Sequence, residues 1–258
     1  MCGIAGCVHT AGEPVPEDLL IRMAKAIEHR GPDDCGVWRH GTVGFAHQRL
    51  SIIDLSTAGH QPMLNESDKV VITYNGELYN YLELKEQLVE AGHQFRSQTD
   101  TEVVIHAYEE WGVACLQRFN GHFAFAIYDT GTRRLFLARD RFGVKPLYYT
   151  VQQGAFVFAS EIKSILLHPE VSRGVCVEAL NEYFTFQNIL SDRTLFEGVY
   201  LLPPGTALTF DGAAGAPRLE KYWDFRIQAE SGLVDEREAE EELYRLFERA
   251  VQRQLMSD

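Results

Sequence analysis

The sequence lacks the features that mark secreted, membrane-spanning or metal-bound proteins. Its five cysteines are an odd number at irregular spacings with no CxxC pair, which argues against a disulfide framework and a cysteine-type zinc site. No apolar run reaches the roughly 18 residues of a membrane span, and no signal peptide pattern begins the chain. The nine histidines show no metal-ligand spacing. We therefore expect a cytoplasmic protein without a bound metal.

Positive charge is also scarce. The 24 Lys and Arg residues face 37 Asp and Glu residues, which gives a formal net charge of -13. This excess of negative charge opposes binding to nucleic acids and anionic membranes, so neither is a predicted partner. The remaining composition is that of a globular protein, and 258 residues suffice for one large domain, or one domain and part of a second.

The hydrophobic pattern predicts an α+β domain built on antiparallel sheets. Between residues 123 and 159, short strand patterns follow one another with only turn sequences between them. Such runs favour hairpins over βαβ units. The predicted strands span residues 4–9, 43–54, 70–74, 123–129, 133–139, 147–152 and 155–159, and the predicted helices begin near Pro16 or span residues 79–92, 100–111 and 236–256.

Cys2 is the first candidate for chemistry. Met1 precedes a small residue, so removal of Met1 is expected, and Cys2 would then carry a free α-amine beside its thiol. A thiol has a pKa of about 8.5 and an α-amine of about 8, so the amine can act as a base near neutral pH. Taken alone, Cys2 is more simply an ordinary small residue of the first strand.

Further short segments accompany Cys2 in a fixed order along the chain. They are Met1–Gly6, His29–Asp33, Gln48–Ile52, Tyr74–Asn80, Thr99–Val103, Gly121–Ala126, Ala138–Tyr149, Ala159–Lys163 and Leu202–Gly205. Together they resemble, over nearly the whole chain, the class II glutamine amidotransferase domain of the asparagine synthetase family. The Arg49-Leu50-Ser51 segment differs from the Arg-Trp-Ala-Thr type of glucosamine-6-phosphate synthases. A chance match of so many ordered segments is negligible, so Cys2 is predicted to be a nucleophile.

The resemblance implies a fold and an activity. The fold is a four-layer αββα sandwich of two antiparallel sheets, that of the N-terminal nucleophile hydrolases. The activity is hydrolysis of L-glutamine to glutamate and ammonia through a thioester on Cys2. In this family the side-chain amide of Asn75 and the backbone N–H of Gly76 hold the oxyanion. No cofactor is implied for the chain itself.

The resemblance also implies how glutamine is held. Arg49 would bind the α-carboxylate, since a planar guanidinium contacts a carboxylate through two hydrogen bonds. Carboxylates would hold the α-ammonium, and backbone would line the pocket. The implied glutamine-binding residues are Arg49, Leu50, Ile52, Ile53, Glu77 and Asp100.

The same residues have simpler structural interpretations. Arg49 could be a surface residue at a strand end, Asn75-Gly76 could form a hairpin turn, and Asp100 could cap a helix. Other groups are predicted to be structural. They are His29 and His47, and a buried or interface ion network of Arg139, Asp140 and Arg141. The aromatics Tyr183, Phe184 and Phe186 are most simply core, although in the family that this chain resembles their region lies near the face toward the synthetase domain.

Two domains are expected from the resemblance. Residues 1–210 would form the glutaminase, and residues 211–258 would be a linker and the first helix of a truncated ATP-dependent synthetase domain. In the family, that C-terminal domain uses ATP and Mg, and it converts aspartate to asparagine with the released ammonia. Two alternatives stay open: an enzyme with another acceptor, and a non-catalytic glutamine-sensing domain. The family often forms dimers, so a homodimer is also expected.

Overall fold

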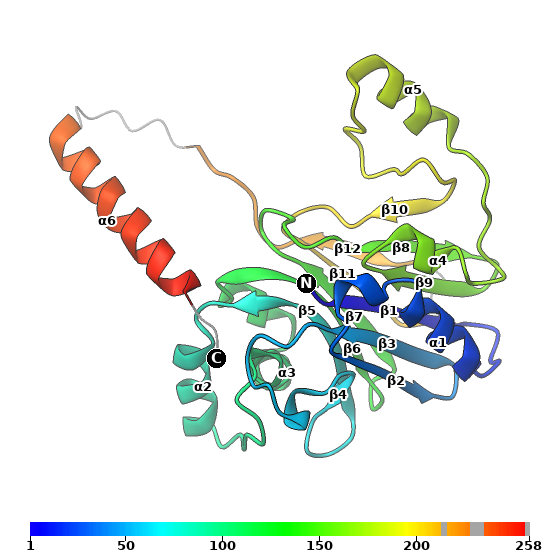
Figure 1. The fold of residues 1–258 in the computed structure, drawn as a ribbon, viewed down its shortest axis with the longest axis horizontal. Coiled ribbons are helices and arrows are strands. Elements are labelled where there is room, and N and C mark those ends of the chain that lie inside the picture. The colour runs from blue at the N-terminus through cyan, green and yellow to red at the C-terminus, as the bar shows by residue number, and fades with distance from the viewer. Residues whose placement is uncertain (213–215, 228–234, 256–258) are drawn as a thin grey trace.

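Two six-stranded antiparallel sheets hold the named strands of the described chain, residues 1–212, 216–227 and 235–255 of the computed structural model. The first sheet contains β1 (Gly3–His9), β2 (Asp34–His40), β3 (Val43–Arg49), β8 (Tyr148–Gln152), β9 (Ala155–Ala159) and β10 (Val199–Leu201). The second contains β4 (Met63–Leu64), β5 (Val70–Leu78), β6 (Gly121–Asp129), β7 (Arg134–Arg139), β11 (Thr206–Phe210) and β12 (Arg218–Lys221). Their orders are β10-β8-β9-β1-β3-β2 and β12-β11-β7-β6-β5-β4 (Figure 1).

The two sheets pack face to face through a shared apolar core. Strand β5 illustrates the alternation, because successive side chains of a strand point to opposite faces. Val71 packs in the core between the sheets, together with Phe45 and Phe158 of the first sheet. Ile72 and Tyr74 point the other way, into the core beneath the helices. The predicted hairpins form, but β6–β7 and β8–β9 belong to different sheets.

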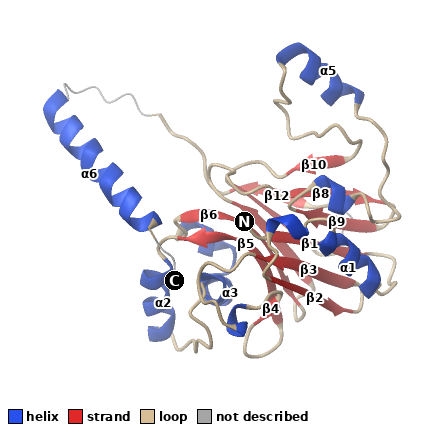
Figure 2. Ribbon diagram, in the orientation of Figure 1, coloured by secondary structure: helices blue, strands red, loops and turns tan. Residues whose placement is uncertain are grey.

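Helices cover the outer face of each sheet (Figure 2). Helices α1 (Glu17–Lys25) and α4 (Ile162–Ile165) pack on the first sheet. Helices α2 (Tyr81–Glu90) and α3 (Asp100–Trp111) and the 3₁₀ helix η3 (Gly112–Gln117) pack on the second. Two more 3₁₀ helices, η1 (Glu28–Arg30) and η2 (Thr57–Gly59), lie in loops. The predicted α+β fold, a four-layer αββα sandwich, is confirmed.

Helices α5 (Val177–Phe186) and α6 (Glu236–Gln254) stand away from the sandwich (Figure 1). The prediction that the aromatics of α5 are core residues is wrong, because Tyr183, Phe184 and Phe186 are 47%, 76% and 58% exposed. Only Ala179 of this helix is buried. Helix α6 forms as expected, and the Asp235 carboxylate caps it by accepting from two backbone N–H groups of the first turn.

Strand β12 joins the second sheet by pairing with β11 from Thr206↔Lys221 to Thr209↔Arg218. The division into residues 1–210 and 211–258 stays a prediction, and its residues 213–215, 228–234 and 256–258 lie outside the described chain.

Among the described helices, none combines the length and apolar character that a membrane crossing requires.

Arg139 and Asp140 bind the backbone instead of forming the predicted ion network. The buried Arg139 guanidinium donates to the carbonyls of Gly143, Lys145 and Leu202. The Asp140 carboxylate accepts from three backbone N–H groups within residues 142–145. Within the described chain no salt bridge joins these two residues. Buried donors need partners, and the loop carbonyls supply them.

Candidate active site at the N-terminus

One cavity beside the N-terminus brings the predicted residues together. It is lined by all three predicted catalytic residues and all six predicted glutamine-binding residues. They come from the residue before β1, the end of β3 and the segment after it, strand β5 and the first turn of α3. The lining residues predicted from sequence are Cys2, Arg49, Leu50, Ile52, Ile53, Asn75, Gly76, Glu77 and Asp100. The fold therefore joins segments that are up to about a hundred residues apart.

The Cys2 sulfur sits against the backbone that follows β3. The N–H of Leu50 donates to Sγ at 3.4 Å, and the thiol donates to the Leu50 carbonyl at 3.6 Å. The Cys2 carbonyl accepts from Arg30 Nε at 3.0 Å. Burial raises the pKa of the Cys2 thiol, while the Leu50 hydrogen bond and the nearby N-terminus oppose that rise. The thiol is therefore protonated at neutral pH and needs a base to become a nucleophile.

Asn75 and Gly76 lie inside strand β5 and not in a hairpin turn. Strand β5 stays paired with β6 as far as Leu78↔Gly121, so both residues have strand partners, at Ala124 and Phe123. The local turn propensity of an Asn-Gly pair is overridden because β6 supplies a full-length neighbour. The alternative interpretation as a turn is wrong.

The side-chain amide of Asn75 is buried and unpartnered. Asn75 is 1% exposed, and its Nδ2 has no hydrogen-bond partner in the described chain. By strand alternation it shares the face of Thr73, whose hydroxyl contacts the Ala46 carbonyl of β3 in the opposite sheet. A buried donor without an acceptor costs about 1–3 kcal/mol. Such a group in a cavity indicates a place for an oxygen atom of a ligand.

Gly76 is required by the close approach of its surroundings. A Cβ at this position would lie 2.7 Å from the His122 carbonyl oxygen and 2.8 Å from the Tyr74 ring. Any larger residue would therefore push β5 away from its neighbours.

Arg49 lines the cavity and is not a surface residue. It is 6% exposed, and its guanidinium donates to the carbonyls of Ile53 and Ser56 at 3.4 and 3.0 Å and also to that of Asp54. Gly59 admits this side chain, since a Cβ there would lie 2.0 Å from Arg49 Nη2. The loop after β3 thus fixes a positive group at the cavity.

Asp100 does not cap α3. Thr99 is the N-cap, and its side chain accepts from the Glu102 N–H. The Asp100 carboxylate instead accepts from the Tyr74 hydroxyl at 2.8 Å and from Leu78 N–H at 2.9 Å. Burial raises the pKa of Asp100 to about 6, against the lowering effect of these hydrogen bonds. At neutral pH the cavity therefore holds a buried carboxylate beside the half-buried Glu77.

The sequence did not single out every lining residue. The cavity also contains Met1, Gly59, Gln61, Tyr74, Thr99, Thr101 and Lys145. Gln61 links two site elements, because its Oε1 accepts from Tyr74 N–H at 2.7 Å and its Nε2 donates to Thr101 Oγ1 at 3.2 Å. In the sequence, Gln61 is marked only by the proline that follows it, because a residue before proline favours extended backbone. That signal is too weak to identify a site residue.

The contact between Arg30 and Glu161 joins two of the ordered segments of the sequence, His29–Asp33 and Ala159–Lys163. Arg30 Nη1 lies 3.0 Å from Glu161 Oε1, across a separation of 131 residues. His29 and Lys163 also contact this carboxylate. Burial raises the pKa of Glu161, but the hydrogen bonds from Lys163, Arg30 and His29 outweigh it and lower the pKa to about 2. The ion cluster thus holds the arginine that binds the Cys2 carbonyl.

Two groups of potential metal ligands meet elsewhere in the described chain. They are Cys7, His9 and His168, and Glu66, His93 and His106. Neither group has a recognisable spacing, since each includes at least one residue that is distant in sequence from the others.

The chain resembles known proteins over its whole length. The family model described as "Glutamine amidotransferase domain" matches residues 1–223. "Asparagine synthetase [glutamine-hydrolyzing] 3" of Bacillus subtilis is 40% identical over 264 residues, which cover 100% of this chain and 42% of that protein. A putative asparagine synthetase [glutamine-hydrolyzing] 2 of Methanocaldococcus jannaschii is 35% identical, with 100% and 53% covered. This chain therefore spans about half the length of these relatives.

A solved structure shares the fold. The glutamine phosphoribosylpyrophosphate amidotransferase of B. subtilis superposes with a TM-score of 0.62 at 20% identity, over 86% of this chain and 49% of that one. At this identity the likeness concerns the fold alone.

Proposed function

Because the chain belongs to the family of glutamine amidotransferase domains, in the branch of the glutamine-hydrolysing asparagine synthetases, we propose that Cys2 cleaves the side-chain amide of L-glutamine through a thioester. The observation that carries the proposal is the buried, unpartnered Nδ2 of Asn75 in the cavity that also holds the Cys2 sulfur. A donor that has no acceptor in the protein is suited to an oxyanion that forms only during the reaction.

Removal of Met1 supplies the base in this mechanism. Met1 lines the cavity and is 54% exposed, so its loss would free the Cys2 amine and open the cavity at the sulfur. Burial already lowers the pKa of the Met1 amine. An amine at the more buried Cys2 position would also be partly neutral near pH 7, and it would take the thiol proton.

The reaction then proceeds in two balanced steps. The thiolate attacks the glutamine side-chain carbonyl carbon, and the amide of Asn75 with the N–H of Gly76 holds the oxyanion. The amine returns its proton to the leaving nitrogen, the carbon–nitrogen bond breaks, and ammonia departs from a γ-glutamyl thioester. Water, deprotonated by the same amine, attacks the thioester and releases glutamate and the Cys2 thiol.

The charges of the cavity match the zwitterionic end of glutamine. Arg49, fixed by loop carbonyls, would bind the α-carboxylate, and the backbone from Leu50 to Ile53 would line that side. Asp100 and Glu77 would bind the α-ammonium. Asp100 is kept in place by Tyr74 and Leu78, so little reorganisation is needed when substrate arrives.

We further propose that the ammonia is consumed by an ATP- and Mg-dependent synthetase domain that makes asparagine from aspartate. The support is that the relatives named asparagine synthetases are about twice as long as this chain. A family member with another acceptor would release ammonia in the same way. A glutamine-sensing domain would bind glutamine without releasing ammonia.

The test is ammonia release from L-glutamine by the purified chain, with the N-terminal mass measured on the same sample. Cys2→Ala should abolish release, whereas Cys35→Ala, which removes an exposed thiol outside the cavity, should leave it unchanged. Glutamine binding without release by protein that begins at Cys2 would favour the sensing domain and overturn the proposal.

A further inference from the structure

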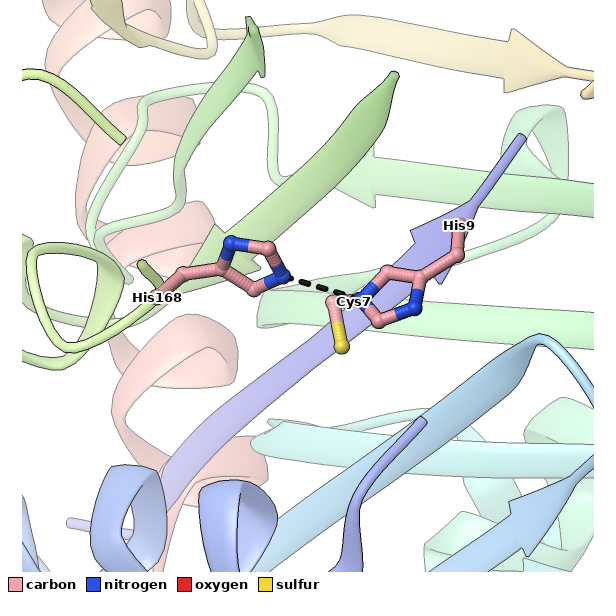
Figure 3. A group of neighbouring side chains, drawn as sticks. All are labelled: Cys7, His9 and His168. Atoms are coloured by element: carbon pink, nitrogen blue, oxygen red, sulfur yellow. Dashed lines mark hydrogen bonds between the residues drawn. The ribbon is translucent and has the colours of Figure 1, made fainter. Parts of the chain in front are cut away.

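A second cysteine on strand β1 meets two histidines far from the catalytic cavity. Figure 3 shows Cys7 and His9 on the strand, with the His168 imidazole pointing at that of His9. One ligand atom from each of the three residues lies within 4.8 Å of the others. Cys7 is fully buried and His168 is 2% exposed, while His9 is half-buried and leaves a path to solvent.

The positions of β1 and the segment after α4 bring these three side chains together. Cys7 and His9 are two positions apart on β1, so both side chains point to the same face, toward the layer that contains α1 and α4. His168 lies just after α4, in the segment that packs on this face. A separation of 159 residues between the two histidines hides the group from any sequence pattern.

The two imidazoles point their Nε2 atoms at each other. His9 Nε2 and His168 Nε2 are 3.0 Å apart, and the rings stand edge to face at 83°. The Glu170 N–H donates to His168 Nδ1 at 3.3 Å, so the His168 proton lies on Nε2 and is donated to His9. His9 Nδ1 then donates to the Glu13 carbonyl at 3.2 Å. The Cys7 thiol has no hydrogen-bond partner in the described chain.

We propose that Cys7, His9 and His168 form a zinc site with one coordination position open to water. A thiolate and two imidazoles are ligands that Zn²⁺ prefers. Tetrahedral bonds of about 2.0–2.3 Å place ligand atoms about 3.3–3.6 Å apart. The two Nε2 atoms, now 3.0 Å apart, would separate by a few tenths of an ångström, and a ligand pair at the 4.8 Å limit would approach by about 1 Å. The carbonyl of Glu13 orients the His9 ring, as outer carbonyls commonly do for metal-bound imidazoles.

The protons balance when zinc enters. The Cys7 thiol releases its proton to solvent and binds as thiolate. The His168 proton moves from Nε2 to Nδ1, which breaks the long contact with Glu170 and frees Nε2 for the metal. His9 keeps its Nδ1 proton and binds through Nε2.

The other potential ligand group is a weaker candidate. Its histidines are already engaged by carboxylates, His106 by Glu109 at 2.8 Å and His93 by Glu110 at 3.2 Å. It also lacks a thiol, and Glu66 is exposed. His93 therefore provides a matched control position for zinc binding.

The site would tie two layers of the fold together without touching the nucleophile. It lies about five residues along β1 from Cys2, which is roughly 16 Å in an extended strand. Bound zinc would join β1 to the segment after α4, and it would stabilise the fold without taking part in glutamine chemistry.

The experiment titrates the chelator-stripped chain with Zn²⁺ against a chromogenic chelator, and with Co²⁺ as a spectroscopic substitute. The chain and its His93→Gln and Cys2→Ala variants should bind one equivalent. Cys7→Ala and His168→Gln should bind more than about 100-fold more weakly, because loss of even an outer-shell partner costs 10- to 100-fold. The thiolate-to-cobalt charge-transfer band should vanish in Cys7→Ala.

His9→Gln, at a half-buried position, gives a second test if a core variant does not fold, and circular dichroism in chelator verifies folding. Zinc should raise the Tm of the parent chain and not that of His9→Gln. Absence of zinc binding by the parent, or binding that disappears with His93 or Cys2, would overturn the site.

Discussion

Replacement of Asn75 by alanine isolates the proposed oxyanion donor. The substitution removes a buried amide whose Nδ2 has no partner in the described chain. Strand β5 is paired with β6 both before and after Asn75. The free protein loses no hydrogen bond from that nitrogen. The transition state loses one donor to the oxyanion, and the second donor, Gly76 N–H, remains.

The expected effects on rate and stability differ in size. Loss of one oxyanion donor raises the activation free energy by about 3 kcal/mol, so kcat should fall about 10²- to 10³-fold with KM nearly unchanged. Stability should change little, since the unpaired amide itself costs about 1–3 kcal/mol and its removal offsets the lost packing. Asn75→Asp should be slower still, because a carboxylate would repel the oxyanion.

Asn65→Ala is the matched control. Asn65 is also a buried asparagine, 3% exposed, but its side chain is fully bonded. It donates to Ser67 and Glu109 and accepts from the N–H groups of Lys69 and Val70. Asn65→Ala should therefore destabilise the fold by about 3 kcal/mol while it leaves kcat unchanged.

The assay pairs steady-state ammonia release with urea unfolding for each variant. A kcat for Asn75→Ala within about tenfold of the parent would refute the oxyanion role, because the calculated loss is at least ten times larger. Equal losses of kcat in Asn75→Ala and Asn65→Ala would also refute it, since that result would reflect packing alone.

Three further outcomes follow from the site. Arg30→Ala should lower kcat about 10- to 100-fold, because Cys2 loses the contact that fixes its carbonyl, and Arg30→Lys should recover part of the rate in the same assay. The KM for glutamine should rise as pH falls through about 6, where Asp100 takes up a proton and loses its charge, and this rise should be absent from the pH profile of Asp100→Asn. Arg49→Lys should raise KM about 10- to 100-fold with a smaller effect on kcat, as measured by substrate titration, since an ammonium cannot replace the bidentate guanidinium.

Much of the fold was predictable from local patterns. Strand β1, the helix from Asp100 to Trp111 and the hairpins between residues 121 and 159 follow from alternation, apolar periodicity and turn residues. The assignment of hairpins to sheets was not predictable, because β1 pairs with β3 and β9 across long separations. Helix α5 shows the same limit: its apolar residues suggest core, but tertiary structure leaves them exposed.

The candidate site was predictable as a set of residues and not as a geometry. The family resemblance named nine of the sixteen residues that line the cavity. The position of Asn75 and Gly76 within a strand depends on β6, and the strand ladder overrides turn propensity there. Gln61 and the Cys7 group were missed because their partners are distant in sequence, so only the folded chain brings them together.

Cleavage of glutamine through a thioester on Cys2 requires a covalent intermediate that can be trapped. The most direct measurement is acid quenching of the chain during turnover, followed by mass spectrometry of its N-terminal peptide, with hydroxylamine as a trap. We predict a γ-glutamyl adduct on Cys2 in peptide that lacks Met1, and formation of γ-glutamyl hydroxamate at the expense of glutamate. Sustained glutamate release without an adduct or hydroxamate, or release that persists in Cys2→Ala, would show that the reaction does not pass through a thioester on Cys2.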